Sequence, residues 1–192
     1  MTPVLHLASA SPRRAELLRA LGLQFTQGGA DLDESRLPGE APADMVVRLA
    51  ADKARATSHD GIVLAADTAV VLGERVFGKP RDEDDACAML SALSAQVHTV
   101  MTGVAVDDGD SMHTVLSASE VRFRAISDAE MHRYWATGEP HDKAGAYAVQ
   151  GLGGVFVEAL SGSYSGVVGL PVFETAVLLR QVGIDVLQDH HG

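Results

Sequence analysis

The chain has 192 residues, of which 46% are hydrophobic and 21% charged, and its formal net charge at pH 7 is -11. A chain of this length buries roughly 70% of its unfolded surface, which is enough for one domain or two small lobes. An acidic surface repels polyanions, so we expect no general binding of nucleic acid or of anionic membranes. The single cysteine excludes an internal disulfide and a zinc site built from several thiolates.

Targeting signals are not expected in this sequence. The longest apolar stretches fall short of the ~20 residues that a membrane-spanning helix needs. Residues 1–4 lack the charged and apolar regions of a signal peptide, and we therefore expect a cytoplasmic protein.

Short apolar strands alternate with helical stretches along the chain, which predicts an α/β fold. We expect a buried strand over 4–8, a helix over 12–22 with Ser11 as its N-cap, a loop over 27–34 and a helix over 42–54. The elements expected after these are an apolar run over 62–72 that is broken at 67–68, a hairpin return over 75–77, a helix over 82–93, strands over 96–107 and 111–124, a helix over 127–138, strands over 144–149 and 155–160, a helix from 171, and a solvated end over 190–192.

The junction between the first strand and the first helix has an unusual charge pattern. Ser9 and Ser11 supply hydroxyl groups, and Arg13 and Arg14 lie in a helical first turn that normally prefers acidic residues. A helix N-terminus and arginine side chains both donate hydrogen bonds that match phosphate oxygens. The pattern therefore indicates an anion site, although ordinary surface arginines on a capped helix explain it equally well.

Two charged residues lie where apolar ones are expected. Lys53 follows Val46 and Leu49 by seven and four residues, on the inward stripe of its helix, and Asp67 interrupts an apolar run. A lysine can extend from such a stripe to water without a function, and a buried aspartate can serve only to cap a bend. A buried carboxylate is costly unless it meets a metal, a cation or a proton. We therefore expect the strand to end at a cleft, where Asp67 binds a divalent cation or acts as a general base on water. Glu34, in the acidic loop, is a candidate second carboxylate, but such loops are more often simply solvated.

Three familiar motifs are absent from the sequence, and a fourth segment is ambiguous. Residues 150–154 fail as a dinucleotide-binding fingerprint, because Phe156 occupies the third glycine position and a strand is expected after it. In 162–166, Tyr164 stands where a hydrolase elbow needs its nucleophile, and the histidines lack the H-E-x-x-H spacing of a zinc protease. The loop 78–81 contains Lys79 between Gly and Pro, which is typical of a plain turn as well as of a rigid cationic loop.

In combination, the segments of the chain resemble the Maf family of nucleoside triphosphate pyrophosphatases. No single segment is specific, but their order and spacing together are. The segments are LASASPRR (7–14), DE (33–34), RLAADKA (48–54), ADT (66–68), GKP (78–80), MTG (101–103), DKAGAYAVQG (142–151) and VGLP (168–171).

The resemblance implies an enzyme that hydrolyses a nucleoside triphosphate to the monophosphate and pyrophosphate with a divalent cation, Mg²⁺, Mn²⁺ or Co²⁺. It implies one pyrophosphatase domain over residues 1–192, an elongated two-lobed fold around a twisted mixed sheet with the active-site cleft between the lobes, and a homodimer. Asp67 is then the proton acceptor. The other implied roles are substrate specificity for Arg13, Thr68 and Gln150, phosphate binding for Ser9, Arg13, Arg14, Lys53 and Lys79, and metal binding for Glu34 and Asp67.

Within the family, the combination of Arg13, Thr68 and Gln150 resembles the dTTP/UTP pyrophosphatases, whereas the 7-methyl-GTP branch carries glutamate in place of Gln150. A glutamine amide both donates and accepts hydrogen bonds, which matches the O4 and N3–H of thymine or uracil. A glutamate only accepts, which suits guanine. The sequence therefore predicts hydrolysis of dTTP and UTP, with CTP or modified pyrimidine nucleotides as further substrates.

Two alternatives remain open at this stage. One is a house-cleaning pyrophosphatase for deaminated purine nucleotides such as ITP or XTP. The other is a non-catalytic regulator of cell division (septum formation), a role also associated with the family.

Overall fold

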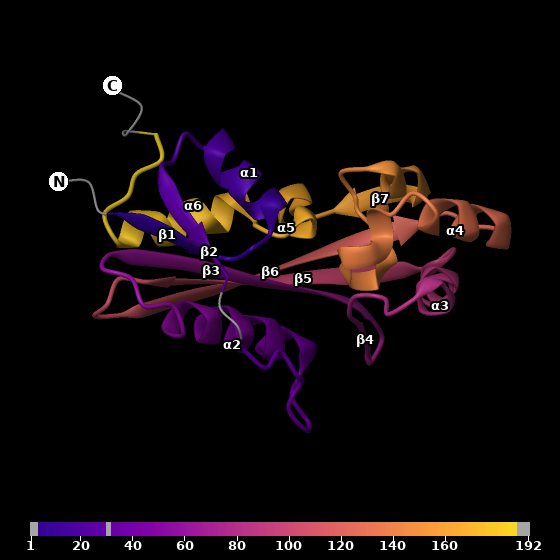
Figure 1. Cartoon of the computed structure of the whole chain (residues 1–192), viewed down its shortest axis with the longest axis horizontal. Helices are drawn as coiled ribbons and strands as arrows, with labels where there is room; N and C mark the ends of the chain where they lie inside the picture. Colours follow the sequence, from indigo (N-terminus) through magenta and orange to yellow (C-terminus); the bar gives the residue numbers. More distant parts are fainter. Residues whose placement is uncertain (1–3, 30–31, 188–192) are drawn as a thin grey trace. The chain divides into compact units, whose positions relative to one another are not determined.

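The computed structural model describes residues 4–29 and 32–187 and contains a seven-stranded mixed sheet with helices (Figure 1). Its path of neighbouring strands is β2-β1-β3-β5-β6-β7, and β4 pairs with β3. The bounds are β1 (Leu5–Ala8), α1 (Pro12–Ala20), β2 (Phe25–Gly28), α2 (Pro42–Arg55), β3 (Ile62–Leu72), β4 (Arg75–Phe77), α3 (Glu83–Leu93), β5 (Val97–Asp107), β6 (Met112–Phe123), α4 (Asp128–Trp135), β7 (Val157–Ser161), α5 (Tyr164–Val168) and α6 (Val172–Gln181), with 3₁₀ turns at Glu139–Asp142, Ala144–Ala146 and Leu152–Phe156. The predicted α/β class is confirmed.

The described residues fall into two compact units. The first contains those of 1–67, 102–117 and 169–192, and the second contains 68–101 and 118–168. The single domain over 1–192 stays a prediction.

In the first unit, residues 62–66 of β3 are all apolar because both faces of the strand are covered. Ile62, Leu64 and Ala66 belong to one hydrophobic cluster, which includes residues of α1 and α6. Val63 and Ala65 belong to another, which includes alanines of α2. Successive side chains of a strand point to opposite faces, so a strand covered on both sides has no polar alternation. The same alternation assigns Asp67 to the face of Val63 and Ala65, which is the face that α2 covers (Figure 1).

The second unit has a core rich in aromatic side chains. Phe123, Tyr134, Tyr147 and Phe156 are all buried there, together with apolar residues of α3. Their rings meet edge-on, for example Phe123 with Tyr147 at 4.7 Å between centroids and Tyr134 with Phe156 at 5.2 Å. Edge-to-face packing of this kind favours one arrangement of the rings over others. The loop segments that contribute Tyr147 and Phe156 are thereby fixed.

The predicted interruption of the apolar run at Asp67 and Thr68 is wrong. β3 continues through both residues to Leu72 and then pairs antiparallel with β4. The predicted strand over 144–149 is also wrong, since its first residues form a 3₁₀ turn in which Gly145 has a φ of 69°. This segment is apolar because it packs into the aromatic core, and not because it pairs with a strand.

Smaller differences concern the edges of the elements. The expected loop 27–34 begins with the last residues of β2, which pairs parallel with β1 and was not predicted because its Thr26 and Gln27 are exposed. Ser11 takes the predicted N-cap position of α1, but its side chain accepts no capping hydrogen bond. The last strand begins at Val157 rather than at 155, and α5 was not predicted. Residues 30–31 of the loop and the predicted solvated end over 190–192 lie outside the described residues.

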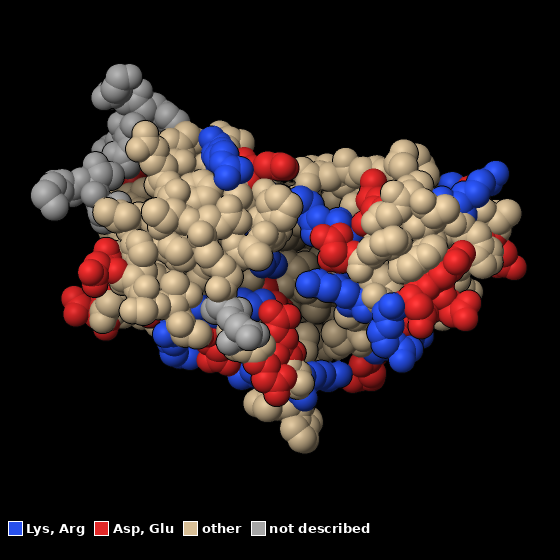
Figure 2. All heavy atoms as spheres, in the orientation of Figure 1, with Lys and Arg blue, Asp and Glu red and all other residues tan. Residues whose placement is uncertain are grey.

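Within residues 4–29 and 32–187, no helix combines the length and the apolar character that crossing a membrane requires. On the face drawn in Figure 2, basic side chains lie interspersed with acidic ones.

The close approach of α2 to β5 depends on Gly103. A methyl group on this residue would meet the backbone of Val46, and would lie 2.7 Å from the backbone nitrogen of Val47. Because backbone cannot move aside as a flexible side chain does, we predict that Gly103→Ala destabilises the protein by about 1–3 kcal/mol in urea denaturation. The matched control is Gly78→Ala, where an added methyl meets nothing within 4 Å. Equal stability of the two variants would contradict this packing.

Candidate active site

The ammonium group of Lys53 joins two carboxylates in the first unit. Its Nζ donates to Oδ1 of Asp67 at 2.6 Å and lies 2.8 Å from Oε1 of Glu34. Lys53 and Asp67 are each 8% exposed, whereas the side chain of Glu34 is 54% exposed. The pair between Lys53 and Asp67 is therefore a buried ion pair with an opening toward water on the side of Glu34.

The helix α2 places Lys53 in this position. Val46, Leu49 and Ala50 are buried on the stripe that continues to Lys53 one turn later. The stripe faces the sheet, and Asp67 is the polar residue that β3 presents on that face. A charge on either residue alone would be costly to bury, and each one offsets the cost of the other. The helical spacing and the strand alternation together explain why the two meet.

Arg48 holds the loop that carries Glu34. Its guanidinium donates to both carboxylate oxygens of Glu40, at 2.5 and 2.8 Å, and to the backbone carbonyl of Ser35 at 3.1 Å. The hydrogen bonds from Arg48 lower the pKa of Glu40 to about 2, so this carboxylate stays charged at neutral pH. A bidentate arginine–carboxylate pair restricts both side chains. Arg48 thus fixes the backbone beside Glu34, a role that no expectation from the sequence assigned to it.

The start of α1 lies in the same unit and carries the basic residues. The Oγ of Ser9 accepts from the backbone N–H of Ser11 at 3.2 Å and from Nη1 of Arg14 at 3.1 Å. Nε of Arg14 donates to the carbonyl of Gly169 at 2.8 Å. Burial lowers the pKa of Arg14, the charge of Asp67 raises it, and the charge of Arg13 lowers it again. Arg14 is therefore in the electrostatic field of the Lys53–Asp67 pair.

Gln27, which no pattern in the sequence singles out, supports the segment between β1 and α1. The side-chain amide of Gln27 donates to the carbonyl of Ser9 at 2.9 Å. Gln27 reaches Ser9 because β2 runs parallel to β1, where Gln27 is the register partner of Leu7. Long-range strand pairing of this kind leaves no local pattern in the sequence.

The other predicted residues belong to the second unit. Thr68 is half-buried in β3, while Lys79 and Gln150 are exposed in loops. Gln150 lies in a turn between Ala148 and Leu152, and Lys79 follows β4. The first unit brings together Ser9, Arg14, Glu34, Lys53 and Asp67, and the second carries Thr68, Lys79 and Gln150.

The carboxylates of Asp67 and Glu34 suit a hard divalent cation. Carboxylate oxygens are the ligands that Mg²⁺ and Mn²⁺ prefer, and Mg²⁺ often takes only one or two from the protein and the rest from phosphate and water. Both carboxylates already converge on one cation, the ammonium group of Lys53. No group of three or more His, Cys, Asp or Glu residues suited to a metal exists among the described residues. The two carboxylates therefore fit a metal that phosphate oxygens also bind.

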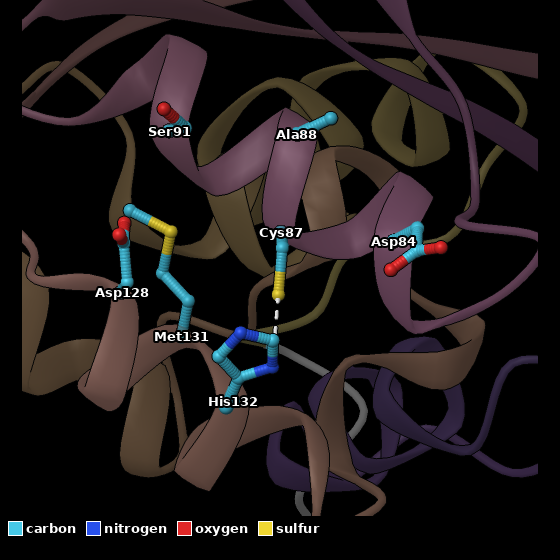
Figure 3. A pocket seen from close by; sticks show the side chains of 7 residues that line it. All are labelled: Asp84, Cys87, Ala88, Ser91, Asp128, Met131 and His132. Atoms are coloured by element: carbon cyan, nitrogen blue, oxygen red, sulfur yellow. Dashed lines mark hydrogen bonds between the residues drawn. The ribbon is translucent and has the colours of Figure 1, made fainter.

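A separate pocket of about 320 Å³ lies between α3 and α4 in the second unit (Figure 3). Sγ of Cys87 and Nδ1 of His132 are 3.8 Å apart at this pocket, and the same nitrogen lies 2.7 Å from Oε1 of Glu83. Burial and the charges of nearby carboxylates raise the pKa of Cys87, so its thiol is a poor nucleophile. The described residues that line the pocket include none of the predicted site residues.

Comparison with known proteins decides the family. The family described as Maf-like protein matches residues 4–182. The chain belongs to the Maf family. Its relatives include the dTTP/UTP pyrophosphatases of Hahella chejuensis, 51% identical over 96% of this chain and 95% of that protein, and of Anaeromyxobacter dehalogenans strain 2CP-1, 57% identical over 95% and 96%. That of Pasteurella multocida is 47% identical over 94% of this chain and 96% of its own. The family predicted from the motifs is confirmed.

The stability of this Maf protein should depend on the buried ion pair. Lys53→Met leaves the carboxylate of Asp67 buried without its cation, and we predict a loss of about 3 kcal/mol in urea denaturation. Replacing both residues, Lys53→Met with Asp67→Leu, should recover most of that loss, since no buried charge is left.

The matched control for this prediction is Arg55→Met on the same helix. Arg55 pairs with Asp52 at 3.1 Å, but its side chain is 60% exposed, so its loss should cost about 0.5 kcal/mol or less. Equal losses for the two single variants would show that the Lys53–Asp67 pair does not stabilise the fold.

Proposed function

We propose that this chain hydrolyses dTTP and UTP to the nucleoside monophosphate and pyrophosphate. The observation that carries the proposal is the buried Lys53–Asp67 pair with Glu34 beside it, in the same unit as a basic helix N-terminus. Relatives that are 47–57% identical over nearly the whole chain are named dTTP/UTP pyrophosphatases, which gives the substrate.

In the proposed reaction, cations hold the triphosphate. Arg14 is oriented by Ser9 and Gly169, and Arg13 precedes it in the first turn of α1, where free N–H groups and the helix dipole also favour an anion. Lys53 adds a charge from α2, and Lys79 adds one from the second unit. A triphosphate carries about four negative charges, so a protein with a net charge of -11 binds it only through such a local concentration of cations.

Asp67 is the proposed proton acceptor. A water molecule attacks the α-phosphorus, its oxygen forms the new P–O bond, and one of its protons passes to the carboxylate of Asp67. The bond from the α-phosphorus to the bridging oxygen breaks, and pyrophosphate leaves with the electron pair. The side chain of Lys53 keeps the carboxylate of Asp67 oriented through their 2.6 Å contact.

Glu34 and Asp67 are the residues that would hold the divalent cation, Mg²⁺, Mn²⁺ or Co²⁺. When bound, such a cation neutralises charge on phosphate oxygens and acts as a Lewis acid. Arg48 supports this role by fixing the backbone next to Glu34.

Gln150, Thr68 and Arg13 are the proposed specificity residues. The amide of Gln150 presents one donor and one acceptor, which pair with O4 and N3–H of thymine or uracil. Pairing with both N1–H and N2–H₂ of guanine needs two acceptors, whereas the amide of Gln150 has one, so on that edge its N–H₂ would face a donor. A mismatch of this kind in a site without water is costly, so one side chain is able to discriminate between bases.

Some finer features belong to the same proposal. They are a cleft between two lobes as the place of the reaction, a homodimer and a cytoplasmic location. The cleft and the homodimer follow from the resemblance to Maf pyrophosphatases, and the location is carried over from the expectation for the sequence.

The test is a panel of nucleoside triphosphates with detection of pyrophosphate and of the nucleotide product. We predict that dTTP and UTP give monophosphate and pyrophosphate, with kcat/KM at least about 10-fold above those of ITP, XTP and GTP. Preference for ITP or XTP would favour the house-cleaning alternative, and the absence of hydrolysis would favour a non-catalytic role.

Asp67→Asn is the control that assigns the activity to this site. The amide cannot accept the proton, so we expect kcat to fall by about 100-fold or more. Asp110→Asn changes an exposed carboxylate in the β5–β6 turn and should leave kcat unchanged. An active Asp67→Asn variant would remove Asp67 from the role of base.

A further inference from the structure

The segment that carries Gln150 is a tight turn in the second unit. The N–H of Gly151 donates to the carbonyl of Ala148 at 3.3 Å, and the N–H of Gly154 donates to the carbonyl of Gly151 at 3.1 Å. Gln150 itself is exposed, so no packing of its own holds it. Its position is therefore set by whatever anchors the turn on either side.

A tyrosine and a glutamate anchor both sides of this turn. The hydroxyl of Tyr134 accepts from the N–H of Ala148 at 3.1 Å and donates to Oε1 of Glu139 at 2.6 Å. The Glu139 carboxylate also accepts from the N–H groups of Leu152 at 2.9 Å and of Gly153 at 2.9 Å. The network thus binds the backbone two residues before Gln150 and two and three residues after it.

The glycines of the turn are required by these two side chains. A methyl group on Gly151 would collide with the carboxylate of Glu139, and one on Gly153 would lie 2.5 Å from the hydroxyl of Tyr134. The run 150–154 fails as a dinucleotide motif, but this network explains its glycines. They let a carboxylate and a phenol approach the backbone.

The protonation of the two groups suits their roles. Burial raises the pKa of Tyr134, and its hydrogen bond to Glu139 raises it further, so the phenol keeps its proton. Burial acts to raise the pKa of Glu139, but the hydrogen bonds from Tyr134, Gly153 and Leu152 outweigh it and bring the pKa below its ordinary value. At neutral pH, a phenol donor therefore faces a carboxylate acceptor.

We propose that Tyr134 and Glu139 are positioning residues that hold the backbone of Gln150 in the conformation that reads the pyrimidine base. The inference rests on the proposed function, because it assigns Gln150 a role in recognition. Neither residue needs to touch the nucleotide. They act by keeping the turn in one conformation before the base arrives.

Loosening the turn lowers the fraction of molecules in which Gln150 is correctly placed. If only a fraction of molecules present Gln150 correctly, the apparent affinity for a pyrimidine nucleotide falls by that fraction, while the chemistry of bound molecules is unchanged. Three donors converge on the two oxygens of Glu139, and a glutamine at this position has one acceptor oxygen and an N–H₂ group that would face a donor. Glu139→Gln should therefore loosen the turn with almost no change in side-chain volume.

The experiment measures kcat and KM for dTTP and GTP with Glu139→Gln, Tyr134→Phe and the wild type. We expect both variants to raise KM for dTTP about fivefold with kcat within about twofold, and to lower the dTTP-to-GTP ratio of kcat/KM by the same factor. Tyr134→Phe keeps the ring against Phe156. If Glu139→Gln does not fold, the dTTP-to-GTP ratio of Tyr134→Phe alone tests the positioning role.

The matched control is Glu130→Gln. Glu130 is another hydrogen-bonded carboxylate of the second unit, which pairs with Arg124 at 2.7 Å and caps α4. It should lower stability without changing the nucleotide ratio. Folded variants of Tyr134 and Glu139 with an unchanged ratio, or an equal fall in Glu130→Gln, would overturn the inference.

Failure of the inference and failure of the proposed function give different results. A wild type that does not prefer dTTP over GTP, or a Gln150→Ala variant that keeps the preference, contradicts the proposed recognition by Gln150 and the positioning role with it. A selective wild type that depends on Gln150 but not on Tyr134 or Glu139 contradicts the inference alone.

Discussion

The buried ion pair between Lys53 and Asp67 is the interaction on which the first unit depends. It lies between a sheet strand and a helix that are otherwise apolar at their contact, and each charge is there only because the other is. A pair of apolar residues would fill the same space at lower cost in solvation. The proposed role of Asp67 as proton acceptor gives a reason for a carboxylate and an ammonium group in this place, with Glu34 as the more exposed third charge.

Around this pair, the protein uses backbone-directed hydrogen bonds to fix loops that have little packing of their own. Arg48 binds the carbonyl of Ser35 beside Glu34, and Gln27 binds the carbonyl of Ser9 at the start of α1. In the second unit, Glu139 binds the N–H groups that follow Gln150. In each case, a segment with a proposed role in binding is held by a neighbour that has no such role. Glu34 and Gln150 thereby gain order although they are exposed.

Much of the fold and the inward positions of Lys53 and Asp67 were predictable from the sequence. The physical reasons for this also explain which predictions were wrong. Asp67 could be singled out because a carboxylate in an apolar run needs a partner, but that partner was unknown, and the strand was therefore expected to end there. Lys53 supplies the partner from α2, so β3 continues. The apolar segment 144–149 was taken for a strand because its burial in the aromatic core and the positive φ of Gly145 cannot be inferred from hydropathy. Glu139 carried no signal at all, since its partners are backbone groups brought to it by the tertiary fold.

Hydrolysis of dTTP in ¹⁸O-labelled water tests the central claim, that this chain directs water to the α-phosphorus and releases pyrophosphate. Mass spectrometry of the two products locates the oxygen that came from water. Attack at the α-phosphorus places one labelled oxygen in the thymidine monophosphate and none in the pyrophosphate. Label in pyrophosphate would show attack at the β-phosphorus, and labelled inorganic phosphate with dTDP would show removal of the terminal phosphate. Either result would contradict the proposed reaction.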